Sequence, residues 1–552
     1  MRPTVALYGI SDHSAASGRP SVHDHNICVM VGGKVLHYLH VERLTRRKYD
    51  NSLPEIVDDL LSGELAYVMS QDPDVVSVDS FAGRHFASKS RRLRIDCGAD
   101  NLRPGLEAVP ASWQREGYGH ERFRGYCLSH EIAHVTSVLP FSPPPEEGAL
   151  FVHFDGGASV SNFSAFLWRS GELAPIEWHW DLGPIASIYN SSVLSFALLG
   201  IPRQAHCTLA GKLMGYASLQ SPRADVVKWL EGQGYFLACQ NFPSLFFREA
   251  RERFGWQGGD FDTHDPFLQT VAASLQDIFV TAWKDKLADL SEIHRPSSIY
   301  LSGGCALNIV ANASLLALRG LPPLYIPPCC NDAGLSIGAA CMLELSKGNS
   351  ISGHSPYLNS MSTDLPETTP LKQDTLGRVA ELLAGGAVIG VCNGWGEAGP
   401  RALGNRSLLA RADCPELARH VSQTCKEREW YRPIAPVMRM EQAKRLLVLD
   451  LPHHLGRYML LEFQVAPSSG HCLDGVVHAN GSVRAQILEV EADNPFLWRL
   501  LNVLEVQYGI CALLNTSFNG PNEPMVHTAQ EARDAMRRMR LDGVVINGEL
   551  EV

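Results

Sequence analysis

Two histidines in the segment HEIAH have the spacing of a metal site. On a helix, His130 and His134 lie one turn apart, so their imidazoles point to the same side and can share an ion. Asp332 in the later turn CNDAG adds a carboxylate, and two histidines with one carboxylate suit iron(II) with open coordination positions. Two other interpretations are open. The pair could satisfy local hydrogen bonds, or HEIAH could be the HExxH motif of a zinc protease with Glu131 as general base, although no third ligand follows closely.

Glycine-rich turns follow strand-like segments at three places, Asp155–Ser159, Leu301–Asn308 and Cys330–Gly334. Glycine lets the backbone approach a phosphate or a purine, and amides at the start of a following helix favour anions. Three such turns in one region predict nucleotide binding. Lys212 in GKLMGYA contacts a phosphate in this interpretation, or else lies on a solvated helix. The predicted nucleotide-binding residues are Gly156, Gly157, Lys212, Gly303, Gly304 and Asn308.

Basic residues gather in three segments of the C-terminal part, GEAGPRALGNRS, KEREWYRP and SVRAQ. Several lie among glycine, proline and aromatic residues rather than in a helical charge stripe. Guanidinium groups bind phosphate in a bidentate manner, so arginines from separate loops can hold a small phosphoryl donor. Alternatively, they pair with surface carboxylates. Asn515 in LLNTSFN could fix a small planar group through its amide. The basic residues are Arg401, Arg406, Lys426, Arg428, Arg432 and Arg484.

The composition indicates a globular enzyme of more than one domain. The chain has 552 residues, 45% hydrophobic and 19% charged, which is ordinary for a folded protein. A formal charge of −11 argues against nucleic acid as a partner. The 14 cysteines include no CxxC pair, so we expect reduced thiols. Because no secretory signal pattern or membrane-length apolar run occurs, we expect a cytoplasmic protein without membrane contact.

Hydrophobic patterning predicts an α/β protein. Short apolar runs such as TVALYGI, NICVMV and ALFVHFD are typical of strands, and LQTVAASLQDIFVTAWKDKLADL has the three-to-four spacing of a helix. A segment rich in Ser, Pro, Asn and Thr follows ACMLELSKG and predicts a linker. We therefore divide the chain into an N-terminal domain (1–350), a linker (351–370) and a C-terminal domain (371–552).

The order of these motifs resembles the O-carbamoyltransferases of antibiotic and nodulation-factor biosynthesis. HDHNICVMVGG, from His23, and VERLTR, from Val41, are similar to the family's HDASAALLVDG and EERFTR. HEIAH, GKLMG, SGGCALN, NDAG, GPRALGNRS, KEREWYRP and LLNTSFN then follow in the family's order over nearly the whole chain. GPRALGNRS is the longest of these motifs and is specific by itself.

The resemblance implies an actin/sugar-kinase ATPase-like N-terminal domain and a smaller, YrdC-like C-terminal domain. It implies that the C-terminal domain uses ATP to activate carbamoyl phosphate as carbamoyl-adenylate, and that the N-terminal domain passes the carbamoyl group to a small-molecule hydroxyl beside Fe(2+). ATP is expected with Mg(2+), and a homodimer is one option for the assembly. Residues that match the family's site are His130, His134 and Asp332 for the metal, His23, Lys426 and Arg432 for catalysis, and Arg401, Lys426, Arg432, Arg484 and Asn515 for carbamoyl phosphate.

The sequence departs from the family pattern near its start. GISDHSAASGRPSV precedes the histidine motif, so either residues 11–22 are an insertion or His13 is the true counterpart; the spacing to Gly33 favours His23. His25 and Asn26 replace small residues and are expected to reshape the acceptor pocket. Two rival functions are a tRNA-modifying transferase and a non-catalytic, nucleotide-switched binding module of the actin-like superfold. The net charge counts against the first, and the arginine cluster with the metal set counts against the second.

Overall fold

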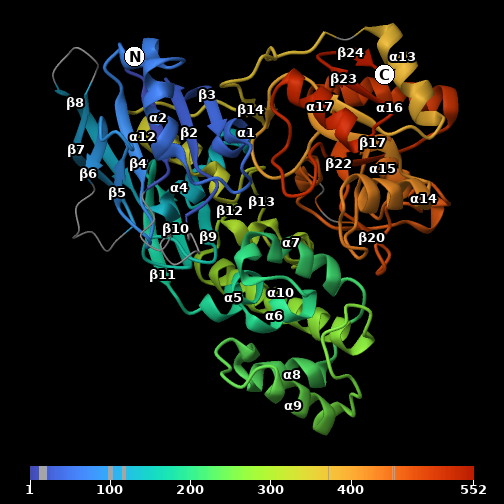
Figure 1. The fold of residues 1–552 in the computed structure, drawn as a ribbon. Helices are drawn as coiled ribbons and strands as arrows, with labels where there is room; N and C mark the ends of the chain where they lie inside the picture. Colours follow the sequence, from blue (N-terminus) through green and yellow to red (C-terminus); the bar gives the residue numbers. More distant parts are fainter. Residues whose placement is uncertain (11–21, 97–103, 115–119, 371, 451, 453) are drawn as a thin grey trace.

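The computed structural model describes all residues except 11–21, 97–103, 115–119, 371, 451 and 453. The predicted α/β class is confirmed, because three large sheets alternate with helices along the chain. Two of the sheets and a group of helices belong to the N-terminal part, and the third sheet forms a separate C-terminal unit, drawn in orange and red in Figure 1. In the described part of the chain, no helix has the length and apolar character needed to cross a membrane.

The first sheet is mixed, with the strand order β16-β14-β3-β2-β1-β4-β8-β7-β6-β5. Its central strand β1 is buried along its whole length, pairs in parallel with β4 and antiparallel with β2, and is covered by α12. The strands are β1 (Thr4–Tyr8), β2 (Asn26–Val31), β3 (Lys34–His40), β4 (Asp74–Val78), β5 (His85–Ala87), β6 (Leu93–Asp96), β7 (Leu106–Gln114), β8 (His120–Leu128), β14 (Tyr357–Asn359) and β16 (Gly396–Glu397). The helices beside it are α1 (Val41–Thr45), α2 (Leu53–Ser62), α3 (Ala66–Met69), α4 (His130–Thr136) and α12 (Leu335–Ser346).

The second sheet has the order β11-β10-β9-β12-β13, and its middle strand β9 is completely buried. Its strands are β9 (Leu150–Phe154), β10 (Phe163–Arg169), β11 (Glu172–His179), β12 (Ile299–Ser302) and β13 (Leu324–Tyr325). The helices that follow or separate these strands are α5 (Gly183–Asn190), α6 (Val193–Leu199), α7 (His206–Ala217), α8 (Ala224–Gly232), α9 (Ser244–Phe254), α10 (Pro266–His294) and α11 (Ile309–Leu316). α10 includes the predicted helix and begins at Asp265, whose carboxylate accepts from the Phe267 and Leu268 amides as an N-cap.

The C-terminal sheet has the order β21-β18-β22-β17-β15-β23-β24. Its strands are β15 (Ile389–Cys392), β17 (Arg406–Arg411), β18 (Ala435–Arg439), β21 (Gln486–Leu488), β22 (Leu513–Ser517), β23 (Gly543–Ile546) and β24 (Glu549–Glu551). A separate pair is formed by β19 (Phe463–Gln464) and β20 (Ser482–Val483). The helices are α13 (Gln373–Ala384), α14 (Pro415–Arg419), α15 (Met440–Leu446), α16 (Pro495–Tyr508) and α17 (Ala529–Met539).

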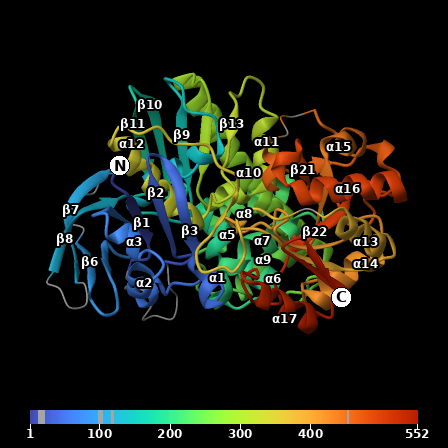
Figure 2. The same ribbon diagram turned by 90° about the horizontal axis from the view of Figure 1, so that it is seen from above.

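The segment predicted as a linker is partly structured. Residues 357–359 form β14, which pairs with β3 of the N-terminal part and with β16, so the first sheet continues across the predicted boundary. A second contact lies at α1, where the Arg46 guanidinium pairs with Glu531 at 3.3 Å and donates to the Met525 and Pro524 carbonyls. Viewed from above, α1 and α17 accordingly lie close together (Figure 2). The two units are therefore joined by backbone pairing as well as by side chains.

Candidate functional site

The structure brings His130, His134 and Asp332 together from two distant segments. The Nε2 atoms of the two imidazoles lie 3.0 Å apart, and Asp332 Oδ1 lies 3.6 Å from His130 Nε2 and 3.4 Å from His134 Nε2. Ligand atoms about 2.1 Å from one ion lie roughly 3.0 to 3.4 Å from one another in octahedral or tetrahedral geometry. The three donor atoms thus have the separations that a single divalent ion requires, and all three side chains are buried.

Helix packing sets these separations. α4 carries both histidines, and α12 begins just after Asp332. The two helices touch at Gly338, where an added Cβ would lie 1.7 Å from the Ala133 carbonyl oxygen, so only glycine permits this approach. Thr136 Oγ1 donates to the Gly338 carbonyl at 2.8 Å, which fixes the helices in register.

Two further side chains orient the Asp332 carboxylate and its loop. The Tyr8 hydroxyl donates to Asp332 Oδ2 at 2.7 Å, which leaves Oδ1 for the histidines. Asn26 Nδ2 donates to the Asp332 carbonyl at 2.9 Å, and Asn26 Oδ1 accepts from the Ser336 amide. Such outer partners fix ligand orientation at metal sites. Burial opposes ionisation of Asp332, but the nearby His130 and His134 imidazoles hold its pKa well below the ordinary value.

Glu131 has a structural role that the protease interpretation does not provide for. Its Oε1 accepts hydrogen bonds from the backbone amides of Ser159, Val160 and Ser161 at 2.8 to 3.1 Å, and from the Ser161 hydroxyl. Through Oε1 the carboxylate therefore anchors the turn after β9. This occupation of Glu131 argues against a zinc protease.

The glycine turns at the ends of β9 and β12 meet at Asp155. Its carboxylate accepts from the backbone amides of Gly156 and Gly304, and Gly303 has a φ of 107° where a Cβ would lie 2.2 Å from the Phe154 carbonyl oxygen. These turns follow the carboxyl ends of the adjacent parallel strands β9 and β12, and they bring together the predicted nucleotide-binding residues Gly156, Gly157, Gly303 and Gly304.

The other two predicted nucleotide-binding residues have protein partners. Asn308 Oδ1 accepts from the Ala311 amide as the N-cap of α11, and its side chain also pairs with Gln276. Lys212 Nζ lies 2.7 Å from Glu429 Oε1 of the C-terminal unit. The structure thus shows Lys212 in an ion pair, rather than on the solvated helix face that was the alternative.

His23 is linked through its neighbour Asp24 to the loop of Asp332, one of the three potential metal ligands His130, His134 and Asp332 (the metal set). His23 Nδ1 is 3.1 Å from Asp24 Oδ2, and the same oxygen accepts from Asn331, which precedes Asp332. Burial disfavours the charged imidazole, but the Cys207 thiol and Asp24 outweigh it and raise the pKa of His23 well above its ordinary value. Conversely, burial raises the pKa of the Cys207 thiol, and His23 and His206 lower it to about 7 overall. The alternative, His13, lies outside the described residues.

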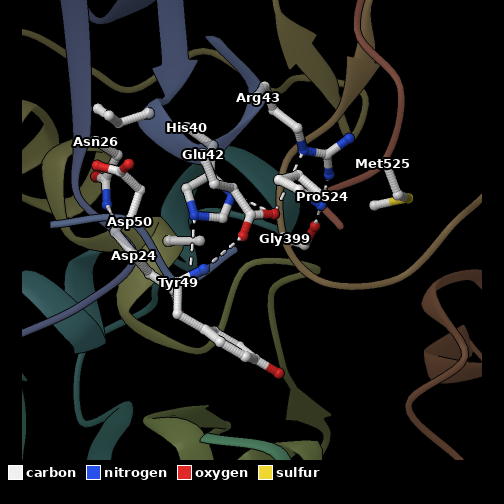
Figure 3. Close-up of polar contacts among 12 residues, drawn as sticks. Asp24, Asn26, His40, Glu42, Arg43, Tyr49, Asp50, Gly399, Pro524 and Met525 are labelled. Atoms are coloured by element: carbon white, nitrogen blue, oxygen red, sulfur yellow. Dashed lines mark hydrogen bonds and ion pairs between the residues drawn. The ribbon is translucent and has the colours of Figure 1, made fainter. Parts of the chain in front are cut away.

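A chain of polar contacts runs from Asp24 to the C-terminal unit (Figure 3). Asp24 Oδ1 lies 3.2 Å from His40 Nε2, and His40 Nδ1 lies 3.8 Å from Glu42 Oε1. The same Glu42 oxygen is 3.7 Å from Arg43 Nε, and Arg43 Nη2 donates to the Gly399 carbonyl at 3.5 Å. This series of contacts links the Asp24 carboxylate beside His23 with the loop that carries Arg401.

His25 and Asn26, which were expected to reshape the acceptor pocket, both have buried side chains. His25 is buried and its Nδ1 accepts from the Leu53 amide, so the ring is turned toward α2. Burial lowers the pKa of His25 to about 3. Asn26 supports the Asp332 loop as described above. Asn26 is the first residue of β2, which is buried along nearly its whole length, and His25 directly precedes this strand.

The basic residues of the C-terminal unit form a cluster without carboxylate partners. Among the described residues, no ion pair involves Arg401, Arg428, Arg484 or Lys426, and Nε of Arg401 and Arg484 has no hydrogen-bond partner. Burial and the neighbouring Arg401, Arg428 and Arg432 hold the pKa of Arg484 well below its ordinary value, and burial lowers that of Arg428 to about 9. Arg432 pairs with Glu429 at 3.5 Å, its one ion pair among the described residues. This excess of half-buried positive charge could hold an anion.

Lys426 and Asn515 form the base of this cluster. Lys426 Nζ donates to the backbone carbonyl and side-chain oxygens of Ser517 and Asn519 at 2.6 to 3.1 Å, so the ammonium holds the loop after β22. Asn515 Nδ2 donates to Gln486 and Ala402, and its buried Oδ1 has no partner among the described residues. Arg406 differs from the others, because its guanidinium donates to five backbone carbonyls and is structural.

The arginine cluster of the C-terminal unit lies next to the N-terminal segment that leads to Asp332. Gly399, with a φ of 97°, packs where a Cβ would lie 2.2 Å from the Pro328 carbonyl oxygen, so the GPRALGNRS loop lies on the segment that leads to Asp332. Arg401 is close enough to Cys330 to counteract the effect of burial on the pKa of that thiol. A group released from the arginine cluster would therefore emerge near the metal set.

Sequence reasoning missed Asp24, Asp155, His153 and Cys207. His153 belongs to β9 and Asp155 directly follows it, and a histidine in a strand that is otherwise Leu, Phe and Val was a signal that could have been used. Cys207 offered no signal, because α7 brings it to His23 only through the tertiary fold.

The chain belongs to the carbamoyltransferase family. It matches the family descriptions "Carbamoyltransferase N-terminus" over residues 121–341 and "Carbamoyltransferase C-terminus" over residues 380–551. It is 36% identical over 530 residues to the 3'-hydroxymethylcephem-O-carbamoyltransferase of Amycolatopsis lactamdurans, covering 92% of this chain and 93% of that protein. It is 26% identical over 580 residues to nodulation protein NolNO of Sinorhizobium fredii, covering 99% and 81% of the two chains. The chain is therefore an enzyme, a carbamoyltransferase, as predicted.

Solved structures give weaker matches. A ROK family protein from Streptococcus pneumoniae covers 63% of this chain and 99% of its own at 12% identity, with a TM-score of 0.29. Full-length HypF in a phosphate- and nucleotide-bound form covers 32% and 21% at 16% identity, with a TM-score of 0.23. Overlaps of this quality do not assign a fold, so the description of the fold stays at mixed α/β.

Proposed function

We propose that the chain is an ATP-dependent O-carbamoyltransferase that forms carbamoyl-adenylate from carbamoyl phosphate and transfers its carbamoyl group to a hydroxyl of a small molecule. The observation that supports this proposal is the half-buried cluster of Arg401, Arg428 and Arg484, which has no ion pair among the described residues and whose loop packs against the segment that leads to Asp332. We further propose an actin/sugar-kinase ATPase-like fold for the N-terminal domain and a YrdC-like fold for the C-terminal domain.

Activation is assigned to the arginine cluster. Carbamoyl phosphate is a dianion with a planar end, so guanidinium groups neutralise its phosphate while Asn515 Oδ1 accepts from its amide. With water, carbamoyl phosphate and ATP yield carbamoyl-adenylate, phosphate and pyrophosphate. Adenylate is a good leaving group, which the carbamoyl carbon needs because its nitrogen donates into the carbonyl.

Transfer is assigned to the site beside His23. The imidazole takes the proton of the acceptor hydroxyl at its Nε2, while Asp24 holds Nδ1 and so fixes the ring. His130, His134 and Asp332 would hold the metal, with Tyr8 orienting the carboxylate. A bound divalent cation would supply Lewis-acid polarisation of the carbamoyl oxygen. The turns at Gly156 and Gly304 would receive the nucleotide phosphates through their backbone amides.

The acceptor is proposed to be a hydroxymethyl or sugar hydroxyl of a secondary metabolite. The support is the relative whose name specifies a 3'-hydroxymethylcephem, which matches this chain over nearly its full length. The nodulation proteins also match over most of the chain.

The test is pyrophosphate release on mixing purified protein with ATP, with and without carbamoyl phosphate, in the absence of acceptor. We expect release that requires carbamoyl phosphate and that is lost in Arg484→Ala. Arg499→Ala is the matched control, because Arg499 lies on α16 of the same unit and is paired with Glu491 at the surface. No release from wild-type protein supplied with Mg(2+) and Fe(2+), or equal release from Arg484→Ala, would contradict the assignment.

A further inference from the structure

A second group of metal-ligating side chains adjoins the His130, His134 and Asp332 set. It consists of His134, which the two groups share, and of His153 and Asp155 on β9 and the turn after it. One potential ligand atom from each of these three residues lies within 4.8 Å of the other two. Asp155 Oδ2 is 3.6 Å from His134 Nε2, and the His153 ring stacks on His134 with centroids 5.1 Å apart.

His153 is in an unfavourable position for a residue that serves only packing. It is fully buried, and among the described residues neither of its ring nitrogens has a hydrogen-bond partner. A buried polar group without a partner is costly, so nearly all such groups in proteins are paired. A leucine or phenylalanine, like the neighbours of His153 on β9, would fill the same space without leaving two polar atoms unpaired.

The geometry allows a metal to satisfy one of these nitrogens. Three atoms no more than 4.8 Å apart lie at most about 2.8 Å from a common centre, so closure by at most about 0.7 Å gives the ~2.1 Å of a metal–nitrogen bond. The α4 histidines approach from one side of this space and β9 from the other, because α4 packs against β9. An ion held through His134 Nε2 is therefore within reach of the β9 side chains.

We propose that His153 is an additional ligand of the metal ion in this chain, with Asp155 beside it, so that the ion is held by three imidazoles rather than two. The inference rests on the metal site of the proposed function and goes beyond it. Imidazole favours ions such as Fe(2+), Co(2+) and Zn(2+), whereas sites of carboxylates and water favour Mg(2+) and Mn(2+). A third imidazole would therefore bias the site toward the former ions.

The test uses Co(2+) as a spectroscopic probe, added to the metal-free full-length protein. Dissociation constants are measured by calorimetry, and the visible absorption of bound Co(2+) reports its coordination. In His153→Phe we expect Co(2+) binding to weaken by at least about tenfold and the visible spectrum to change. His179→Phe is the matched control. It also replaces an imidazole, but His179 lies on β11, stacks on Phe163 of β10 and belongs to neither group of potential metal ligands.

A second variant covers the case in which phenylalanine disturbs the fold. In His153→Cys, a thiolate on the ion would give an intense near-ultraviolet sulfur-to-cobalt band that the wild-type protein lacks. Wild-type affinity and spectrum in His153→Phe, together with no such band in His153→Cys, would overturn the role of His153. If the role of His153 fails in this way, the proposed metal site still stands provided that wild-type protein binds Co(2+) and His130→Ala does not. A wild-type protein that binds no Co(2+) would overturn both.

Discussion

Replacing Gly338 by alanine tests whether helix packing holds the metal ligands at their separations. The new Cβ would lie 1.7 Å from the Ala133 carbonyl oxygen, whereas real Cβ contacts essentially never fall below 3.0 Å. α4 and α12 must therefore separate by about 1.3 Å. His134 Nε2 lies on α4 and Asp332 Oδ1 just before α12, so their 3.4 Å separation should grow by a similar amount.

Two opposing effects on stability can be compared. Alanine has a helix propensity about 1 kcal/mol better than glycine, which alone would stabilise the variant. Overpacking typically costs about 1 to 3 kcal/mol, and the obstruction here is backbone rather than a flexible side chain. We therefore expect a net loss of stability, and at least a tenfold loss of metal affinity because the ligand set can no longer close on one ion.

The assay is thermal unfolding of the metal-free protein together with Co(2+) titration. Gly377→Ala is the control, because Gly377 lies on α13 and an added Cβ there would meet nothing within 4 Å. That variant should keep its metal affinity and be equally or more stable. If Gly338→Ala is as stable as wild type and binds Co(2+) with the same affinity, the argument that this contact sets the ligand geometry is refuted.

Four further outcomes are expected. His23→Gln should reduce carbamoyl transfer by about 100- to 10,000-fold and leave pyrophosphate release intact, and equal loss of both would contradict a role confined to transfer. Burial lowers the pKa of His23, but Cys207 and Asp24 outweigh it and raise this pKa well above the ordinary imidazole value of about 6.5. The base form therefore accumulates only well above that pH, and the transfer rate should still be increasing there in a pH profile. Removal of the bound metal with a chelator, followed by resupply of Mg(2+) alone, should abolish transfer but not acceptor-independent pyrophosphate release. Arg484→Leu should lose donor binding yet unfold at an equal or higher temperature, because a half-buried cation among other cations is removed; a large drop in melting temperature would mean that Arg484 is structural.

The sequence by itself determined several helices and strands, and those parts of each site whose residues lie close together along the chain. NICVMV became β2, the long periodic segment became α10, and HEIAH became a helix, because burial periodicity and capping act over a few residues. The spacing of His130 and His134 places both imidazoles on one side of α4 for the same reason. Motif order also identified the carbamoyltransferase family, which the comparisons confirm.

Only the tertiary structure decided which distant residues meet. Arg401 and Arg406 lie in one motif, yet Arg406 is saturated by backbone carbonyls and Arg401 has no carboxylate partner. Lys212 pairs with a residue of the other unit, and β14 joins the first sheet although its composition predicts a linker. The physical reason is that hydrogen bonding, burial and charge pairing depend on neighbours far away in sequence, whereas sequence patterns report mainly the neighbours along the chain.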